Sequence, residues 1–214
     1  MNLKRLPAFL LAFCVALMAA VTASLAEPVK IVGFGDSLMA GYQLDAADAF
    51  PVQLEAALRE RGHEVEIANA GVSGDTTAAG LARLDWSVPE GTDAVILELG
   101  ANDALRGIAP ERTEANLDEM ITRLKDRGIE VLLAGMIAPP NMGGDYAERF
   151  NPIFERLAEK HDLILYPFFL DGVAADEALN LDDGMHPNAE GVAIMVERFL
   201  PAAEDLLERV KPEA

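Results

Sequence analysis

Short apolar runs alternate with amphipathic segments along almost the whole chain, and this alternation limits the possible folds more than any other feature. The apolar runs cover residues 29–33, 64–68, 94–99, 130–134 and 163–166. Each run is too short for an ordinary helix and most are apolar on both faces, which is typical of strands buried within a sheet. We therefore predict five buried strands.

The segments between these runs have the spacing of helices. Leu54, Ala57 and Leu58 fall on one helical face, and apolar residues within 117–124 and 154–158 repeat the pattern. A last helix should begin near Asn188, because asparagine is a good N-cap. Strands that alternate with helices predict a parallel sheet with helices on both faces, in one domain spanning residues 27–214.

The first 26 residues differ from the rest of the chain. Lys4 and Arg5 precede an apolar stretch over 6–23, and Ser24-Leu25-Ala26 fits a signal peptidase site. We expect residues 1–26 to be a signal peptide, so that the protein is exported to a periplasm or secreted, with no stable membrane insertion after cleavage. An uncleaved membrane anchor is the alternative, because the stretch approaches the roughly 20 residues that cross a bilayer.

Charge and cysteine content exclude several classes of function. The chain has 36 Asp and Glu against 17 Lys and Arg, a net charge of −19, so its surface should repel a phosphate backbone and nucleic acid is not an expected partner. The one cysteine, Cys14, lies within 1–26. Beyond that segment the chain has neither a thiol nucleophile nor a cysteine-ligated metal site.

A serine, a histidine and an aspartate follow the first and last predicted strands, at the edge where open α/β sheets bind ligands. Ser37 comes after the first strand and would need a base to become nucleophilic. His186 comes after the last strand, and Asp183 could accept its Nδ1 proton. His63 and His161 fall at positions better suited to structural roles. Each feature also has a non-catalytic interpretation. Ser37 could be an ordinary turn serine, and Asp183 and His186 could be a pair of loop residues on the surface.

Ester cleavage also requires donors for the oxyanion. Gly71, after the second strand, offers its N–H; Asn102, after the third, offers its side-chain amide; and Ser37 offers its own N–H. Singly, Gly71 and Asn102 are common turn residues. Together with Ser37, Asp183 and His186 they fall in four loops at one predicted edge of the sheet, which indicates a site for acyl transfer.

Four stretches resemble the conserved blocks of the SGNH, or GDSL, hydrolases, and most closely those of their exported bacterial thioesterase, protease, lysophospholipase and arylesterase group. The stretches are Gly35-Asp36-Ser37-Leu38, Gly71, Gly100-Ala101-Asn102-Asp103 and Asp183-Gly184-Met185-His186-Pro187. The resemblance covers nearly all of 27–214. It implies a flavodoxin-like three-layer α/β/α sandwich around a five-stranded parallel sheet.

The same resemblance implies a serine esterase that needs neither metal nor other cofactor. Ser37 would be the nucleophile, His186 the base and then the acid, Asp183 its orienting partner, and Gly71 and Asn102 oxyanion donors. The substrates would be small-molecule acyl esters or thioesters, such as aryl esters, acyl thioesters and lysophospholipids, hydrolysed through an acyl-enzyme on Ser37. We expect a monomer.

The acyl pocket is less well defined by the sequence. Leu105 and Ile108 follow Asn102, and Ile137 follows the fourth strand, so all three should border Ser37. We expect them to line a groove for the acyl or aryl group. Alternatively, they pack beneath their own loops.

Two other functions remain open at this point. Asp36, Asp75, Asp103 and Asp183 lie in the same loops and could bind Mg²⁺ or Mn²⁺ in a phosphate-ester hydrolase, although Ser37 and His186 would then have no role. A non-catalytic protein that binds lipid or glycan is the other alternative.

Overall fold

A five-stranded, entirely parallel sheet forms the centre of the protein in a computed structural model that describes residues 27–210. The strand order is β2-β1-β3-β4-β5. The predicted signal peptide, residues 1–26, lies outside the described residues. The strands span β1 (Val29–Gly35), β2 (Val65–Gly71), β3 (Ala94–Glu98), β4 (Glu130–Ala134) and β5 (Ile164–Tyr166). All five predicted strands are present, but only the inner ones are buried on both faces as expected. The edge strand β2 exposes Glu66, Ala68 and Asn69, and the residues of the other edge strand, β5, are all partly exposed.

The first two strands run further than the apolar pattern indicates. β1 continues to Gly35 and β2 to Gly71, and these two glycines pair in register, with Glu98 of β3 on the other side of Gly35. Because the strands are parallel, their carboxyl ends meet at one edge of the sheet. Ser37 follows β1 directly at this edge.

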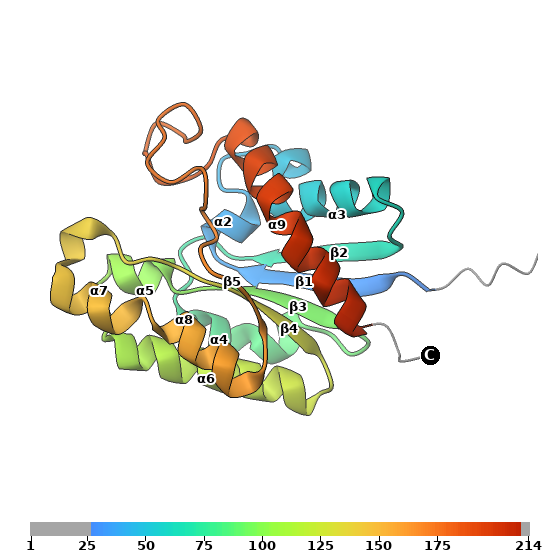
Figure 1. Cartoon of the computed structure of the whole chain (residues 1–214), viewed down its shortest axis with the longest axis horizontal. Helices are drawn as coiled ribbons and strands as arrows, with labels where there is room; N and C mark the ends of the chain where they lie inside the picture. Colours follow the sequence, from blue (N-terminus) through green and yellow to red (C-terminus); the bar gives the residue numbers. More distant parts are fainter. Residues whose placement is uncertain (1–26, 211–214) are drawn as a thin grey trace, which may run out of the picture.

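Helices cover both faces of the sheet, as Figure 1 shows. One face carries α3 (Phe50–Glu60) and α9 (Ala189–Val210); the other carries α4 (Thr77–Ser87), α6 (Pro110–Asp126) and α8 (Ile153–His161). The predicted three-layer sandwich is therefore confirmed. Asn188 caps α9 as expected, since its Oδ1 accepts the Gly191 N–H at 2.9 Å.

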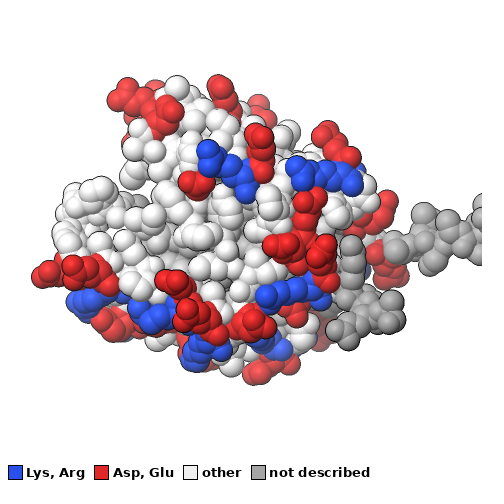
Figure 2. Space-filling model, in the orientation of Figure 1, with Lys and Arg blue, Asp and Glu red and all other residues white. Residues whose placement is uncertain are grey.

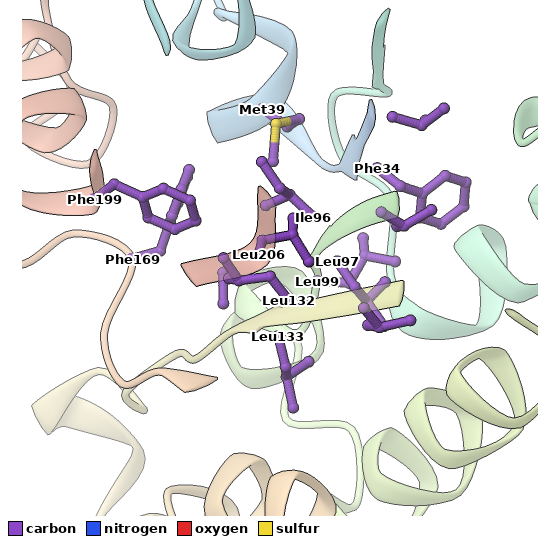
Figure 3. Packing of buried hydrophobic residues seen from close by; sticks show 14 of the residues in the cluster. Phe34, Met39, Ile96, Leu97, Leu99, Leu132, Leu133, Phe169, Phe199 and Leu206 are labelled. Atoms are coloured by element: carbon purple, nitrogen blue, oxygen red, sulfur yellow. The ribbon is translucent and has the colours of Figure 1, made fainter. Parts of the chain in front are cut away.

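Apolar side chains fill the space between the layers. Leu132 and Leu133 are adjacent in β4 and point to opposite faces of the sheet (Figure 3), as the twofold period of a strand requires. On the face of α3 and α9, the rings of Phe50, Phe169 and Phe199 meet edge to face. This packing fixes the sheet whose carboxyl edge carries the site.

Short helical turns cluster at that edge. They are α2 (Ser37–Ala40), 3₁₀ turn η1 (Ala46–Asp48), α5 (Ala101–Leu105), η2 (Pro140–Met142) and α7 (Gly144–Phe150). A long segment over 167–188 joins β5 to α9. Within residues 27–210, no helix is long and apolar enough to cross a membrane.

Candidate active site

Ser37 lies at the N-terminal end of α2, directly beyond β1. Asp36 caps this short helix, with its Oδ1 accepting the Leu38 N–H at 3.0 Å. Backbone N–H groups in a first helical turn have no acceptor within the helix, so the Ser37 N–H is free to bind an anion. A Cβ at Gly35 would clash with Glu98, so glycine lets the turn before Ser37 pack against β3.

The imidazole of His186 connects Ser37 to Asp183. Its Nε2 lies 2.9 Å from Ser37 Oγ, and its Nδ1 lies 2.6 Å from Asp183 Oδ2. The other Asp183 oxygen accepts the N–H groups of Met185 and His186 at 2.9 and 3.0 Å. These backbone hydrogen bonds, followed by the bond to the imidazole, lower the pKa of Asp183 to about 2. The ionised carboxylate accepts a hydrogen bond from the Nδ1–H group. Nε2 therefore carries no proton and can accept a hydrogen bond from the Ser37 hydroxyl.

Backbone bonds and an aromatic ring hold His186 in place. Its carbonyl accepts the Leu181 N–H at 2.7 Å, and Asn180 pairs with Pro187 in an isolated antiparallel bridge. The ring of Tyr42 lies against the imidazole, with 4.5 Å between the ring centroids. The loop after β5 is thereby fastened beside α2.

Asn102 reaches the site from α5. Its Nδ2 donates to Asp36 Oδ2 at 3.0 Å, which leaves the second amide hydrogen available, and Asn102 lines the same cavity as Ser37 and His186. Asp36 therefore orients both the turn that carries Ser37 and the amide of Asn102.

Gly71 does not reach this cavity. It is the last residue of β2, and its N–H donates to Asn69 Oδ1 at 2.9 Å. A Cβ at Gly71 would clash with the backbone of Ala40, so the glycine is needed for the close packing of α2 on β2. The sequence-based expectation that the Gly71 N–H faces the substrate does not agree with this geometry.

Gly74, three residues further along, lines the cavity instead. It lies in a turn closed by the Asp75 N–H donating to the Val72 carbonyl at 3.1 Å, and its φ of +85° explains the glycine. Within residues 27–210 its N–H has no acceptor. Gly74 thus brings a second backbone N–H without an acceptor to the lining of the cavity.

An apolar cavity of about 460 Å³ opens at Ser37. Leu105 and Ile137 line it, as predicted, and each is about half exposed. Ile108 does not; its carbonyl accepts the Tyr146 hydroxyl at 2.8 Å, on the side towards α7. Figure 2 shows an indentation at the left of the molecule, covered by uncharged atoms. Further apolar residues of the lining are Leu38, Met136, Ala138, Pro139, Pro140, Phe168, Leu170 and Met185.

The four loop aspartates that could have formed a metal site bind other parts of the protein. Asp36 and Asp183 make the hydrogen bonds given above, and Asp75 forms a salt bridge with Arg83. Asp103 accepts hydrogen bonds from the Thr77 N–H and from the hydroxyl groups of Thr77 and Thr113. Among residues 27–210 no three His, Cys, Asp or Glu side chains are placed to share a metal ion. The geometry therefore gives the metal-dependent alternative no support.

The remaining histidines lie in ion pairs away from the cavity. His63 Nε2 is 3.3 Å from Glu204, and His161 Nε2 is 2.6 Å from Asp118. Neither residue lines the cavity at Ser37. This agrees with the structural roles expected for both.

A second buried carboxyl group, which the sequence reasoning missed, lies beside Asp36. Glu98 ends β3 and accepts the Asp36 N–H at 3.1 Å. Burial, and then the neighbouring Asp36, raise the pKa of Glu98 well above its usual value. Burial also raises the pKa of Asp36 to about 6. Glu98 is the last residue of an otherwise apolar strand, which is the one signal for it in the sequence.

Comparison with known proteins identifies the family. Residues 34–194 match the model of the GDSL-like Lipase/Acylhydrolase family. The chain belongs to this family. The match begins just before Ser37 and ends beyond His186, so all four stretches singled out in the sequence lie inside it.

Individual members of the family are similar over most of the chain. The arylesterase of Vibrio mimicus is 43% identical over 187 residues, which are 87% of this chain and 90% of that one. Thioesterase 1/protease 1/lysophospholipase L1 of Escherichia coli is 35% identical over 191 residues, 89% of each chain. The solved structure of AlinE4, an SGNH-hydrolase family esterase, has 44% identity and a TM-score of 0.72, covering 89% of this chain and all of that one.

The predicted enzyme class is therefore confirmed: this acylhydrolase is a serine ester hydrolase acting on small-molecule esters. Its family says less about which residues perform each step and about the preferred acyl group. Those points depend on the geometry at Ser37.

Proposed function

We propose that this acylhydrolase cleaves carboxylic esters and thioesters of apolar acyl or aryl groups through an acyl-enzyme on Ser37. The observation that supports this most directly is the continuous hydrogen-bonded chain from Ser37 Oγ through His186 to Asp183, at the mouth of an apolar cavity. The 2.9 Å between Ser37 Oγ and His186 Nε2 is short enough for proton transfer, and the 2.6 Å bond from His186 Nδ1 to Asp183 orients the imidazole.

In the first half of the reaction, His186 Nε2 takes the hydroxyl proton while Ser37 Oγ attacks the acyl carbon. The charge that develops on the carbonyl oxygen is stabilised by the N–H groups of Ser37 and Gly74 and by the free amide hydrogen of Asn102. The imidazolium, oriented by Asp183, then gives its proton to the departing alcohol or thiol. In the second half, water attacks the acyl carbon while His186 Nε2 takes one of its protons. The bond between the acyl carbon and Ser37 Oγ then breaks, the acid leaves, and His186 returns the proton to Ser37 Oγ.

Substrate preference follows from the lining of the cavity. The side chains of Leu105, Ile137 and Met185 provide apolar contact. The carboxylate of Asp183 is hydrogen-bonded to His186 and is not available to bind a cationic substrate. An uncharged acyl or aryl group therefore fits the cavity best. A volume of about 460 Å³ accommodates a medium acyl chain. The arylesterase and thioesterase names of its relatives are consistent with this range of substrates.

The proposed nucleophile and base are tested by turnover of a p-nitrophenyl ester series of increasing acyl length. Ser37→Ala and His186→Ala should each lower kcat by about 10⁴-fold or more, because each removes an essential member of the unit. EDTA should leave the rate unchanged. Loss of turnover in EDTA would instead support the phosphate-ester alternative, and ligand binding without turnover would support a lipid-binding protein.

The other histidines provide matched controls. His63→Ala and His161→Ala remove the same side chain from ion pairs remote from the cavity, so kcat should stay within about twofold of wild type. If either substitution reduced kcat as strongly as His186→Ala in a folded protein, His186 would not be the base.

We also propose that residues 1–26 are a signal peptide and that the working enzyme is an exported monomer of residues 27–214. The positively charged start, apolar stretch and Ser24-Leu25-Ala26 support this assignment. The intact mass of protein recovered from the periplasm of an expressing bacterium should correspond to a chain that begins at Glu27. A mass that includes residues 1–26 would favour the membrane anchor.

A further inference from the structure

A buried arginine lies close to the active site, but the reaction at Ser37 gives it no chemical step. Arg83, on α4, is 6% exposed. A guanidinium remains charged even when buried, so its burial is costly unless its N–H groups are well satisfied. Arg83 stacks on the Phe34 ring, with Cζ 4.0 Å from the ring centroid, and Gly80 brings α4 close enough to the sheet for this contact.

The guanidinium hydrogen bonds reach three separate parts of the chain. Nη2 donates to the Gly35 carbonyl and Nη1 to the Ala70 carbonyl, both at 2.9 Å. Nε donates to Asp75 Oδ2 at 2.6 Å, and Nη1 also donates to Ser87 Oγ at 3.2 Å. Except for Ser87, on α4 itself, the acceptors belong to the ends of β1 and β2 and the loop after β2.

The bond to Gly35 fixes the backbone that leads to Ser37. The Gly35 carbonyl and the Asp36 N–H belong to one peptide group, and Glu98 Oε2 accepts that N–H at 3.1 Å. Arg83 and Glu98 thus hold this peptide group at both ends. Rotation of the group would move Asp36 and, with it, Ser37.

The other two bonds fix the loop that carries Gly74. Ala70 lies four residues before Gly74, and Asp75 lies directly after it. Arg83 therefore binds the chain on both sides of Gly74, which lines the cavity. One planar group connects the segment of the nucleophile to the segment of an oxyanion donor.

We propose that Arg83 is a positioning residue for ester hydrolysis: its guanidinium holds the turn of Ser37 and the loop of Gly74 at a fixed separation. The inference rests on the roles proposed above for Ser37 and Gly74. An oxyanion donor acts only when it is aligned with the oxygen that develops charge, and a displacement of about 1 Å can cost about 100-fold in rate. Arg83 acts through these two segments without touching the substrate.

Arg83→Lys tests the proposal, because lysine keeps the charge but cannot bind three acceptors with a planar fork. We expect kcat for a p-nitrophenyl ester to fall about 10- to 100-fold while KM changes less than about 3-fold. An alkylboronic acid, which forms a tetrahedral adduct with the serine hydroxyl, should lose affinity in proportion to the loss in kcat/KM. If Arg83 had a purely structural role, Arg83→Lys would lower the midpoint of unfolding. The kcat and the boronic acid affinity of the folded molecules would then be unchanged.

Arg127→Lys is the matched control. Arg127 Nη2 also donates to two backbone carbonyls, those of Val88 and Pro89 at 2.7 and 3.1 Å, but before β3, at the opposite edge of the sheet. Its kcat and boronic acid affinity should equal those of wild type. A folded Arg83→Lys protein with kcat and boronic acid affinity within about twofold of wild type would overturn the proposal.

Ser37→Ala separates failure of this inference from failure of the proposed function. If Ser37→Ala retains turnover, the acyl-enzyme mechanism is wrong; if it is inactive while Arg83→Lys is fully active, only the positioning role is wrong. Should Arg83→Lys not fold, Asp75→Asn weakens one of the same bonds with little change in size. It should lower kcat about 3- to 10-fold at constant KM, and an unchanged kcat would equally overturn the proposal.

Discussion

Asp36 is a single residue whose carboxylate makes two separate hydrogen bonds at the site. One of its oxygens caps α2 at Leu38 and the other accepts the Asn102 amide, so a single carboxylate orients both the turn that carries Ser37 and the side chain proposed as an oxyanion donor. The side chain is fully buried next to Glu98, and burial raises its pKa to about 6. The ionised form is therefore more costly in the folded protein than in the unfolded chain.

This pKa predicts how stability depends on pH. Between the ordinary value of 3.8 and about 6, the folded protein binds a proton at Asp36 that the unfolded chain lacks, so stability rises as pH falls. The free energy of unfolding of wild type minus that of Asp36→Asn should increase by roughly 2 to 3 kcal/mol from pH 7 to pH 4. Urea unfolding at each pH measures it. A difference that is flat, or that decreases towards acid, would contradict the burial of an ionisable Asp36.

Single residues were predictable where they follow a strand end closely. Ser37, Asp183 and His186 come together as the sequence indicates, because Asp183 and His186 are three residues apart and both segments leave the same sheet edge. Gly71 is different: β2 runs three residues beyond its apolar pattern, so Gly71 is still in the strand and Gly74 occupies the loop. Apolar spacing does not reveal where a polar strand end stops.

Arg83 and Glu98 illustrate another limit of sequence reasoning. Their bonds to Gly35 and Asp36 join residues 48 and 62 positions apart. A helical arginine is usually exposed and the last residue of a strand can point to solvent, so neither residue type indicates burial. Such contacts depend on how closely α4 and β3 approach β1.

At the scale of elements, the long strands and helices follow from the periodicity, whereas α2 and α5 do not. Four or five residues are too few to show a helical period, and both turns depend on tertiary hydrogen bonds such as that between Asp36 and Asn102. Ile108 was placed wrongly for the same reason. The turn of α5 and the residues after it carry Leu105 to the cavity and Ile108 towards Tyr146.

The close approach of α4 to the sheet leads to a test at this scale. A Cβ at Gly80 would clash with Leu99 Cδ1 and come within 3.3 Å of Phe34 Cε1. Gly80→Ala should therefore lower the free energy of unfolding by about 1 to 3 kcal/mol, although alanine favours the helix. Gly144→Ala, in α7 with nothing within 4 Å of its Cβ position, should be neutral or slightly stabilising in the same urea titration. Equal effects would show that α4 is not tightly packed at Gly80.

At the scale of the whole molecule, the parallel sheet gathers the chemistry at one edge. Ser37, Gly74, Asn102 and His186 come from loops spread over 150 residues and line one cavity. In Figure 2 the indentation is lined by uncharged atoms, and the charged side chains lie elsewhere on the same face. A chain with a net charge of −19 thus offers a neutral acyl group an apolar site within an otherwise acidic surface.

The formation of an acyl-enzyme on Ser37 underlies the whole proposed mechanism, and mass spectrometry of peptides from the trapped intermediate detects it directly. Protein of residues 27–214 is mixed with an excess of a p-nitrophenyl ester, quenched in acid within the first turnover, and digested. We expect one added acyl group on the peptide that contains Ser37, formed together with a stoichiometric burst of p-nitrophenolate and absent from Ser37→Ala. An acyl group on another residue, or turnover that continues in Ser37→Ala, would contradict it.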